Sequence, residues 1–153
     1  MSSAPESIAT DEWKTPAWLL ELVREFNGGQ IGLDPASGPG SLVNAVLYWT
    51  KEFDGLLPPW GGFGLVYVNP PCSRGQIARW MGKCAAEGRT VEIIALPPVA
   101  TATRWWQEHV TTADAICFLE LPVNGSALAV CYWGPRRERF RRVFAPLGWT
   151  IGK

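Results

Sequence analysis

Two short apolar runs, each followed by a pair of prolines, constrain the fold of this 153-residue chain more than any other feature. Residues 65–68 are followed by Asn69 and then Pro70-Pro71, and residues 91–96 by Pro97-Pro98. Because proline has no backbone N–H, each pair marks the end of a buried strand. Amphipathic segments alternate with these runs, a pattern typical of α/β proteins with a largely parallel sheet.

Spacing and turn residues predict the remaining elements. Apolar residues at helical spacing predict a helix over 16–26, with Thr15 as a hydroxyl cap and Pro16 at the first position. Asn124-Gly125 predicts a turn between two adjacent strands. We also expect helices over 41–48, 76–87, 103–110 and 135–144, and strands over 31–33, 115–119, 128–133 and 149–151. The predicted fold is a compact, open α/β sheet, mostly parallel, with an antiparallel pair near one edge.

Composition predicts one domain over residues 11–153 after a short polar tail, residues 1–10. The 14 basic and 14 acidic residues cancel, which argues against a strong whole-molecule field for nucleic acid but not against a local basic patch. No apolar run approaches the roughly 18 residues of a membrane span. The four cysteines form no Cys-x-x-Cys pair and there is one histidine, so we expect reduced thiols, a cytoplasmic protein and no metal site.

The segment Asn69-Pro70-Pro71-Cys72 directly follows a predicted strand. The Asn69 side-chain oxygen and the Pro70 carbonyl are two acceptors in a small space, and the prolines fix the backbone. Such a pair suits a planar amino group, whose two hydrogens it can hold while the nitrogen attacks an electrophile. The alternative is a strand followed by a rigid turn. Pro97-Pro98 lacks a preceding Asn and is expected to be structural or a wall of the same cleft.

A second segment, residues 34–40, contains Asp34-Pro35 and four small residues that let the backbone approach a ligand closely. It is neither a dinucleotide fingerprint nor a phosphate-binding Walker loop. In open α/β sheets, ligands bind beyond the carboxyl ends of the strands, and both segments follow predicted strands.

These segments resemble the S-adenosylmethionine-dependent methyltransferases that act on amino groups of bases, and more narrowly the small phage DNA N-6-adenine methyltransferases. The resemblance runs from Asp11 to about Gly152. In chain order it rests on Asp11-Glu12-Trp13-Lys14-Thr15-Pro16, Leu33-Asp34-Pro35-Ala36, Asp54-Gly55-Leu56, Trp60, Asn69-Pro70-Pro71 with Ser73-Arg74, Trp80, Trp105-Trp106, Tyr132-Trp133-Gly134, Arg139-Phe140 and Phe144. It implies a Rossmann-like class I methyltransferase fold, S-adenosylmethionine as cofactor, DNA as partner and adenine N6 as the acceptor. It also implies a phage- or prophage-encoded protein in a bacterial host.

The resemblance also implies residue roles. Thr15 and Pro16 would hold the amino-acid end of the cofactor, and Asp54 would lie near its adenosine. Residues 34–40 would cradle the methionine portion, with Asp34 nearest the cofactor's amino group, and the candidate cofactor-binding residues there are Asp34, Pro35, Ala36, Ser37 and Gly38. The candidate catalytic segment is Asn69, Pro70, Pro71 and Cys72, of which Asn69 and Pro70 would hold the target amino group. For each acidic residue the alternative is a loop carboxylate that caps a backbone N–H.

The chain departs from the family pattern in two places. Cys72 stands where the family usually has Tyr or Phe to stack on the extruded base, and the link 122–126 replaces a longer basic segment. The rings that could substitute are Trp80, Trp105 and Trp106. Candidate nucleic-acid contacts are Arg74, Arg79, Trp105, Arg136 and Arg137, although the arginine-rich segment 136–142 also fits a solvated amphipathic helix.

Three functions therefore remain open at this point. The first is DNA adenine N6 methylation, which requires base extrusion. The second is a catalytically impaired descendant that binds the cofactor or DNA. The third is transfer to the amino group of an RNA base or a protein glutamine. With so little recognition surface, a homodimer or a partner protein that supplies recognition is also open.

Overall fold

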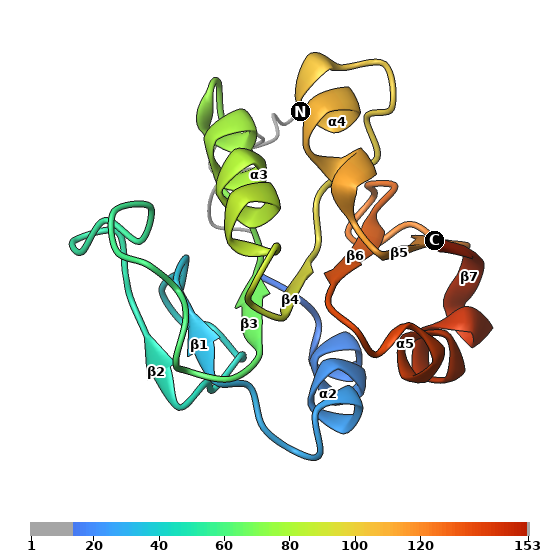
Figure 1. Cartoon of the computed structure of the whole chain (residues 1–153), viewed down its shortest axis with the longest axis horizontal. Helices are drawn as coiled ribbons and strands as arrows, with labels where there is room; N and C mark the ends of the chain where they lie inside the picture. Colours follow the sequence, from blue (N-terminus) through green and yellow to red (C-terminus); the bar gives the residue numbers. More distant parts are fainter. Residues whose placement is uncertain (1–13, 153) are drawn as a thin grey trace, which may run out of the picture.

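A computed structural model describes residues 14–152 as one mixed sheet between two layers of helices (Figure 1). The predicted tail 1–10 and residues 11–13 lie outside the described residues. The strands, in sheet order, are β2 (Leu47–Tyr48), β1 (Leu33–Asp34), β3 (Val66–Val68), β4 (Ile93–Ala95), β6 (Ala129–Trp133), β5 (Ala115–Leu119) and β7 (Gly148–Gly152). The helices are α2 (Ala17–Phe26), α3 (Gln76–Glu87), α4 (Arg104–Glu108) and α5 (Arg137–Phe144), with 3-10 turns η1 (Val110–Thr112) and η2 (Ala145–Leu147).

The sheet has a parallel half and an antiparallel half. Strands β2, β1, β3 and β4 pair in parallel, and β6, β5 and β7 are added in antiparallel pairings. The α/β class is therefore confirmed, and the predicted pair β5–β6 is present. The antiparallel part is larger than predicted, because β7 joins the outer side of β5.

Alternating side chains give the sheet two buried faces, as the two-residue period of a strand requires. Figure 1 shows α3 and α4 on one side of the sheet and α2 and α5 on the other. The face toward α3 and α4 contains Leu33, Val66, Val68, Ile93, Ala95 and Cys131, packed with Trp80, Met81, Cys84 and Trp106. The face toward α2 and α5 contains Leu65, Tyr67, Ile94, Leu96, Val130 and Tyr132, packed with Leu19, Leu20, Val23, Phe26, Phe140 and Phe144.

The helix predicted over 41–48 is wrong. Its last part is strand β2, which pairs in parallel with β1, and Val46 and Leu47 donate backbone hydrogen bonds to the carbonyls of Ile31 and Gly32. Asn44 has a φ of 54°, in the left-handed region that a helix does not continue through. An apolar run as short as this one cannot be assigned to helix or strand from its spacing alone.

The start of α2 also differs from the prediction. Pro16 precedes the first helical residue, Ala17, and no side chain caps the helix. The hydroxyl of Thr15 is instead hydrogen-bonded to the hydroxyl of Tyr67 on β3. Thr15 therefore joins the start of α2 to the centre of the sheet. Among residues 14–152, no helix has the length and apolar character needed to cross a membrane.

Candidate active site

A cavity of about 780 Å³ opens at the carboxyl end of the parallel half. Three segments line it: the loop after β1, the loop after β2, and Pro71 with the first turns of α3. The lining residues named by the sequence prediction are Pro35, Ala36, Ser37, Gly38, Asp54, Pro71, Arg79 and Trp80. The structure therefore brings together four of the five residues of the segment 34–38, Asp54, and Pro71 of the segment 69–72.

The sheet order explains the position of this cavity. From β1 the chain moves outward to β2, then crosses back over β1 to β3 on its other side. The connection after β1 leads to β2 and the connection after β3 leads to β4 in the opposite direction. An open α/β sheet forms its ligand crevice at such a switch point, which here lies between β1 and β3. The backbone N–H of Ser37 bonds to the carbonyl of Trp49, which holds the first two loops together beside this crevice.

Close packing around Gly55 shapes one wall of the cavity. A Cβ on Gly55 would lie 2.1 Å from the carbonyl oxygen of Pro35, so only glycine lets these two loops approach so closely. The indole N–H of Trp60 donates to the Gly55 carbonyl at 2.9 Å. Trp60 stacks on Trp80, with ring centroids 6.2 Å apart, and Trp80 lines the cavity. The wall is therefore fixed by backbone contact and by two buried indoles.

The segment 69–72 follows β3 directly, as predicted. Pro70 is buried, whereas Asn69, Pro71 and Cys72 are half-buried. The Cys72 thiol donates to the Pro70 carbonyl at an Sγ–O distance of 3.3 Å. Pro71 also lines the cavity, so the predicted amino-group acceptors lie directly beside it. The thiol occupies one acceptor direction of the same carbonyl that was predicted to hold the substrate.

Asp34 is a nearly fully buried carboxyl, 2 % exposed, at the end of β1. Its Oδ1 accepts a hydrogen bond from the Ala36 backbone N–H at 3.3 Å. Burial raises the pKa of the Asp34 carboxyl to about 7, against smaller lowering effects from Ala36 and Ser37. Burial also raises the pKa of Tyr67, and the nearby Asp34 carboxylate contributes. Asp34 and the Thr15–Tyr67 pair thus form one polar cluster below the cavity.

Asp54 lies in the cavity wall, where its Oδ1 accepts from the Leu56 backbone N–H at 3.0 Å. The loop-capping alternative is therefore present for both Asp34 and Asp54, and of the two only Asp54 is in the lining described for the cavity. Thr15 and Pro16 are absent from the lining described for it.

The predicted nucleic-acid contacts divide into two groups. Arg79 is exposed and lines the cavity, and Arg74 is exposed on the loop before α3. Trp105 is half-buried in the first turn of α4, which follows the carboxyl end of β4. Of the other two rings, Trp80 is buried against Trp60, and Trp106 is buried and stacked on Phe118. Arg74, Arg79 and Trp105 therefore belong to the carboxyl end of the parallel strands.

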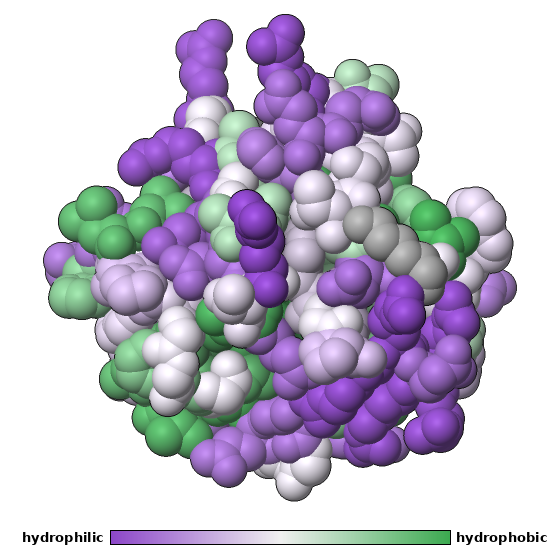
Figure 2. All heavy atoms as spheres, in the orientation of Figure 1, coloured by the Kyte–Doolittle hydropathy of each residue, from purple (hydrophilic) through white to green (hydrophobic). Residues whose placement is uncertain are grey.

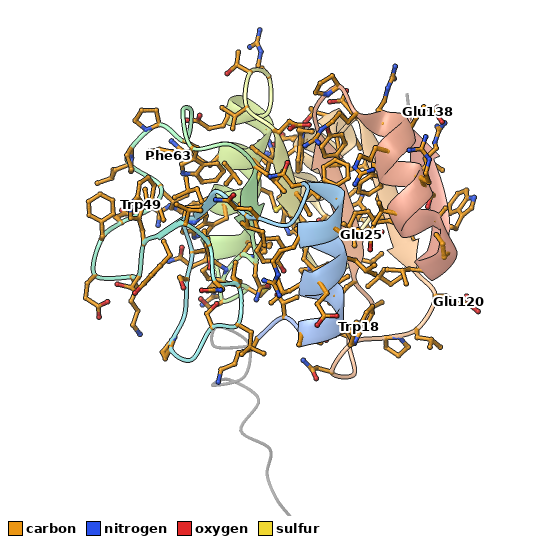
Figure 3. All side chains as sticks on the ribbon, turned by 90° about the horizontal axis from the view of Figure 1, so that it is seen from below. Trp18, Glu25, Trp49, Phe63, Glu120 and Glu138 are labelled. Carbon is orange, nitrogen blue, oxygen red and sulfur yellow. The ribbon has the colours of Figure 1, made fainter. Side chains whose placement is uncertain are left out.

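Arg136 and Arg137 lie at the opposite end of the sheet. They follow β6, whose last residue, Trp133, pairs with Ile93 at the start of β4. In Figure 3, Trp18 near the start of α2 and Glu138 near the start of α5 lie at opposite ends of these neighbouring helices. The structure therefore separates Arg136 and Arg137 from Asn69, whereas Arg74 and Arg79, predicted to be close to the Asn-Pro-Pro segment, lie at the same end of the sheet as Asn69.

Arg136 has a structural set of partners instead. Its guanidinium makes two 2.8 Å bonds to the Glu92 carboxylate and a third, also 2.8 Å, to the Asn27 side chain. The Tyr132 hydroxyl donates to the same carboxylate. Arg139 bonds to the carbonyls of Glu25 and Phe26 at 2.7 Å, which satisfies the end of α2. Although the surface over α5 is strongly hydrophilic (Figure 2), these two arginines join α5 to α2 and to the start of β4.

Several lining residues were given no role by the sequence prediction, namely Thr50, Lys51, Glu52, Gly55, Leu56 and Gln76. Most of them follow β2, the strand that was interpreted as a helix. Had Leu47–Tyr48 been assigned as a strand, the rule that ligands bind beyond carboxyl ends would have indicated residues 49–56. Gln76 could have been found as the first residue of the helix after the Asn-Pro-Pro segment.

Comparison with known proteins agrees with this geometry. The family model of DNA N-6-adenine-methyltransferase (Dam) matches residues 2–140. The match includes the whole cavity lining and the segment 69–72. No curated protein and no solved structure matches the chain. With a family match over most of its length, the chain belongs to the DNA N-6-adenine-methyltransferase (Dam) family.

Proposed function

We propose that the protein transfers a methyl group from S-adenosylmethionine to adenine N6 in DNA. The observation that carries this proposal is the contact between two features: a cavity at the carboxyl end of the parallel strands, and an Asn-Pro-Pro segment that shares Pro71 with it. A methyl donor in the cavity would lie beside the Asn69 and Pro70 oxygens. Family membership supports the same chemistry.

The residues of the cavity fit this cofactor. Its two loops present small residues and the Trp80 ring, which suit a ligand with a flat, partly apolar portion. Asp34 is a buried carboxyl with a raised pKa, and a nearby cationic amino group would stabilise its ionised form. We assign the methionine portion to residues 35–38 and the preceding Asp34, and the adenosine portion to Asp54 and Trp80. When bound, the sulfonium supplies the electrophilic methyl group.

Asn69 and Pro70 would position the acceptor. Two oxygens that accept the hydrogens of a planar amino group hold its nitrogen lone pair toward the methyl donor. This contribution is orientation and electrostatic stabilisation, and it requires no covalent intermediate on the protein. Substrate contact would come from Arg74 and Arg79, which are exposed beside the cavity. Because the net charge is zero and two arginines are the proposed phosphate contacts, we expect DNA affinity to be modest and its salt dependence to be shallow.

The direct test is methyl transfer from a radiolabelled donor to unmethylated DNA, followed by nucleoside analysis. Label in N6-methyladenine is the expected result. Asn69→Ala should lower the rate at least roughly a thousandfold while leaving cofactor affinity within about twofold, because the side chain would act on the acceptor. Retained turnover in this variant would contradict the proposed role. Arg142→Ala, on the exposed side of α5, is the matched control and should leave the rate unchanged.

The contact between Cys72 and Pro70 favours a second candidate, a descendant that binds cofactor or DNA with little transfer. The thiol competes for the carbonyl oxygen, and Cys lacks a ring that could stack on a base. Cofactor binding without label in any DNA would support this candidate. Label in RNA or in protein glutamine instead of DNA would reassign the acceptor.

A further inference from the structure

The outermost strand, β7, is an apolar edge without the usual protection. Within the described residues, β5 is its neighbour in the sheet and its other side is open (Figure 1). Trp149 is 70 % exposed and Ile151 is 41 % exposed. Residues 147–152 contain no charge and no proline. Natural proteins normally shield such edges with lysine, proline or a bulge, because an open edge can pair with another strand.

The hydrogen bonds of β5 show which backbone groups of β7 face outward. Leu119 donates to Leu128 on the β6 side, and Glu120 donates to Leu147 on the β7 side. The alternation along β5 therefore directs even-numbered residues toward β7. Phe118 pairs with Trp149, and Ile116 pairs with Ile151. The backbone N–H and C=O groups of Trp149 and Ile151 therefore bond to β5. The groups that face outward are those of Gly148, Thr150 and Gly152.

We propose that two copies of this chain pair through β7, antiparallel about a two-fold axis at Thr150. The outward groups are self-complementary in this register: Thr150 meets Thr150 of the second copy, and Gly148 meets Gly152. The same register places Trp149 opposite Ile151 of the second copy, on one face of the joined sheet. Aromatic–β-branched pairs are among the favourable cross-strand pairs. The contact is isologous, so it closes as a dimer and does not propagate.

Charges near the two ends of β7 fit the same arrangement. Glu120 is exposed beside the Gly148 end, where its backbone bonds to Leu147. Arg141 lies beside the other end, with a guanidinium nitrogen 3.0 Å from where a Gly152 Cβ would be. Antiparallel pairing brings Glu120 of one copy toward Arg141 of the other, whose guanidinium is also 3.2 Å from Glu138 of its own chain. The opposite sheet edge, β2, has two residues and offers a much shorter backbone ladder.

The first experiment measures mass in solution by sedimentation over a roughly hundredfold range of protein concentration. The full chain should rise from 16.8 kDa toward twice that mass. Thr150→Pro should raise the dimer dissociation constant at least roughly tenfold, because it removes an outward N–H while the bonds to β5 remain. Tyr48→Lys, at the exposed β2 edge, is the control and should leave the constant unchanged.

The second experiment tests the register and does not depend on Thr150→Pro folding. Thr150→Cys should form a covalent dimer on mild oxidation, since opposed residues in an antiparallel pair lie about 5.5 Å apart, within disulfide range. Thr111→Cys, equally a surface threonine, should not. A monomer at all concentrations, a dimer lost in Tyr48→Lys but kept in Thr150→Pro, or absence of the Thr150→Cys cross-link would overturn the proposal. None of these outcomes bears on methyl transfer, which is assayed separately.

Discussion

The parallel and antiparallel halves of the sheet use their residues differently. Strands β1 to β4 have two or three residues each, and the loops after β1 and β2 build the cavity. Strands β5, β6 and β7 have five residues each, and the turn between β5 and β6 is short. The parallel half thus has short strands and loops that line a cavity, whereas the antiparallel half has longer strands in a continuous hydrogen-bonded ladder. Substitutions in the two halves should therefore separate loss of binding from loss of stability.

The largest effect is expected in the parallel half, from Gly55→Val. Its Cβ would lie 2.1 Å from the Pro35 carbonyl oxygen, so the two cavity loops must separate. We expect cofactor affinity to fall at least roughly a hundredfold, measured by calorimetry. Gly61→Ala is the control, because its Cβ would make an ordinary 3.7 Å contact with Val91. Equal affinity in both variants would mean that this contact does not shape the binding site.

The next effect tests the other end of the sheet. Arg136→Ala leaves the half-buried Glu92 carboxylate without its bidentate partner and removes the bond to Asn27. We expect the free energy of unfolding to fall by about 2 kcal/mol, with DNA affinity unchanged, in paired denaturation and binding measurements. Arg142→Ala should change stability by less than about 0.5 kcal/mol. Weaker DNA binding at unchanged stability would restore the nucleic-acid role first predicted for Arg136.

Asp34 should give opposite effects on stability and binding. The pKa of Asp34 is about 7 in the folded protein and near 3.8 in the unfolded chain. Its protonated form therefore contributes fully to the free energy of unfolding below pH 4, and this contribution is lost as the pH rises toward 7. At pH 8, Asp34→Asn should therefore stabilise the ligand-free protein, on the order of 2 kcal/mol. It should also weaken cofactor binding roughly tenfold, because the carboxylate is lost.

The wild-type protein provides the pH control for Asp34. Its cofactor affinity should rise between pH 6 and pH 8 as the carboxyl ionises, and the rise should be absent in Asp34→Asn. An identical pH profile in the two proteins would remove Asp34 from the binding site.

The smallest effect concerns the residue that departs from the family pattern. Cys72→Tyr should improve the Michaelis constant for DNA at least about fivefold, since stacking on a base contributes roughly 1–3 kcal/mol. The substitution also removes the thiol that bonds to Pro70. Steady-state kinetics with a fixed oligonucleotide would measure it. A higher Michaelis constant would indicate that the cysteine fits its site better than a ring does.

Sequence patterns correctly predicted the helices and strands that are determined by their own residues and by the residues next to them. The helix over 76–87 and the strand over 115–119 match α3 and β5 residue for residue, because Gly88 ends the helix and the strand is a continuous apolar run. Strand β2 could not be recognised in this way, since its two residues are extended through backbone bonds to the chain before β1. For that reason the lining residues of the loop after β2 other than Asp54 were given no role.

Charge patterns were less informative than apolar patterns. The local sequence does not distinguish Arg136 from Arg79. In the structure Arg136 bonds to the Glu92 carboxylate, 44 residues away in the chain, whereas Arg79 is exposed at the cavity. Such long-range pairing depends on tertiary structure, and nothing in the local sequence around 136–142 indicates it.

The turn between β5 and β6 is a position at which residues could be inserted without disturbing the sheet. Asn124 and Gly125 have φ values of 52° and 82°, and the strands they join are held by bonds such as Val123 to Ser126. The backbone N–H of Val99, after the carboxyl end of β4, donates to the carbonyl of Ala127, just after the turn. The turn therefore projects from the same end of the sheet as the cavity. A basic segment inserted there would extend toward a substrate without entering the core. A loop inserted at this turn would therefore lie on the cavity side of the sheet and outside residues 35–80, which line the cavity.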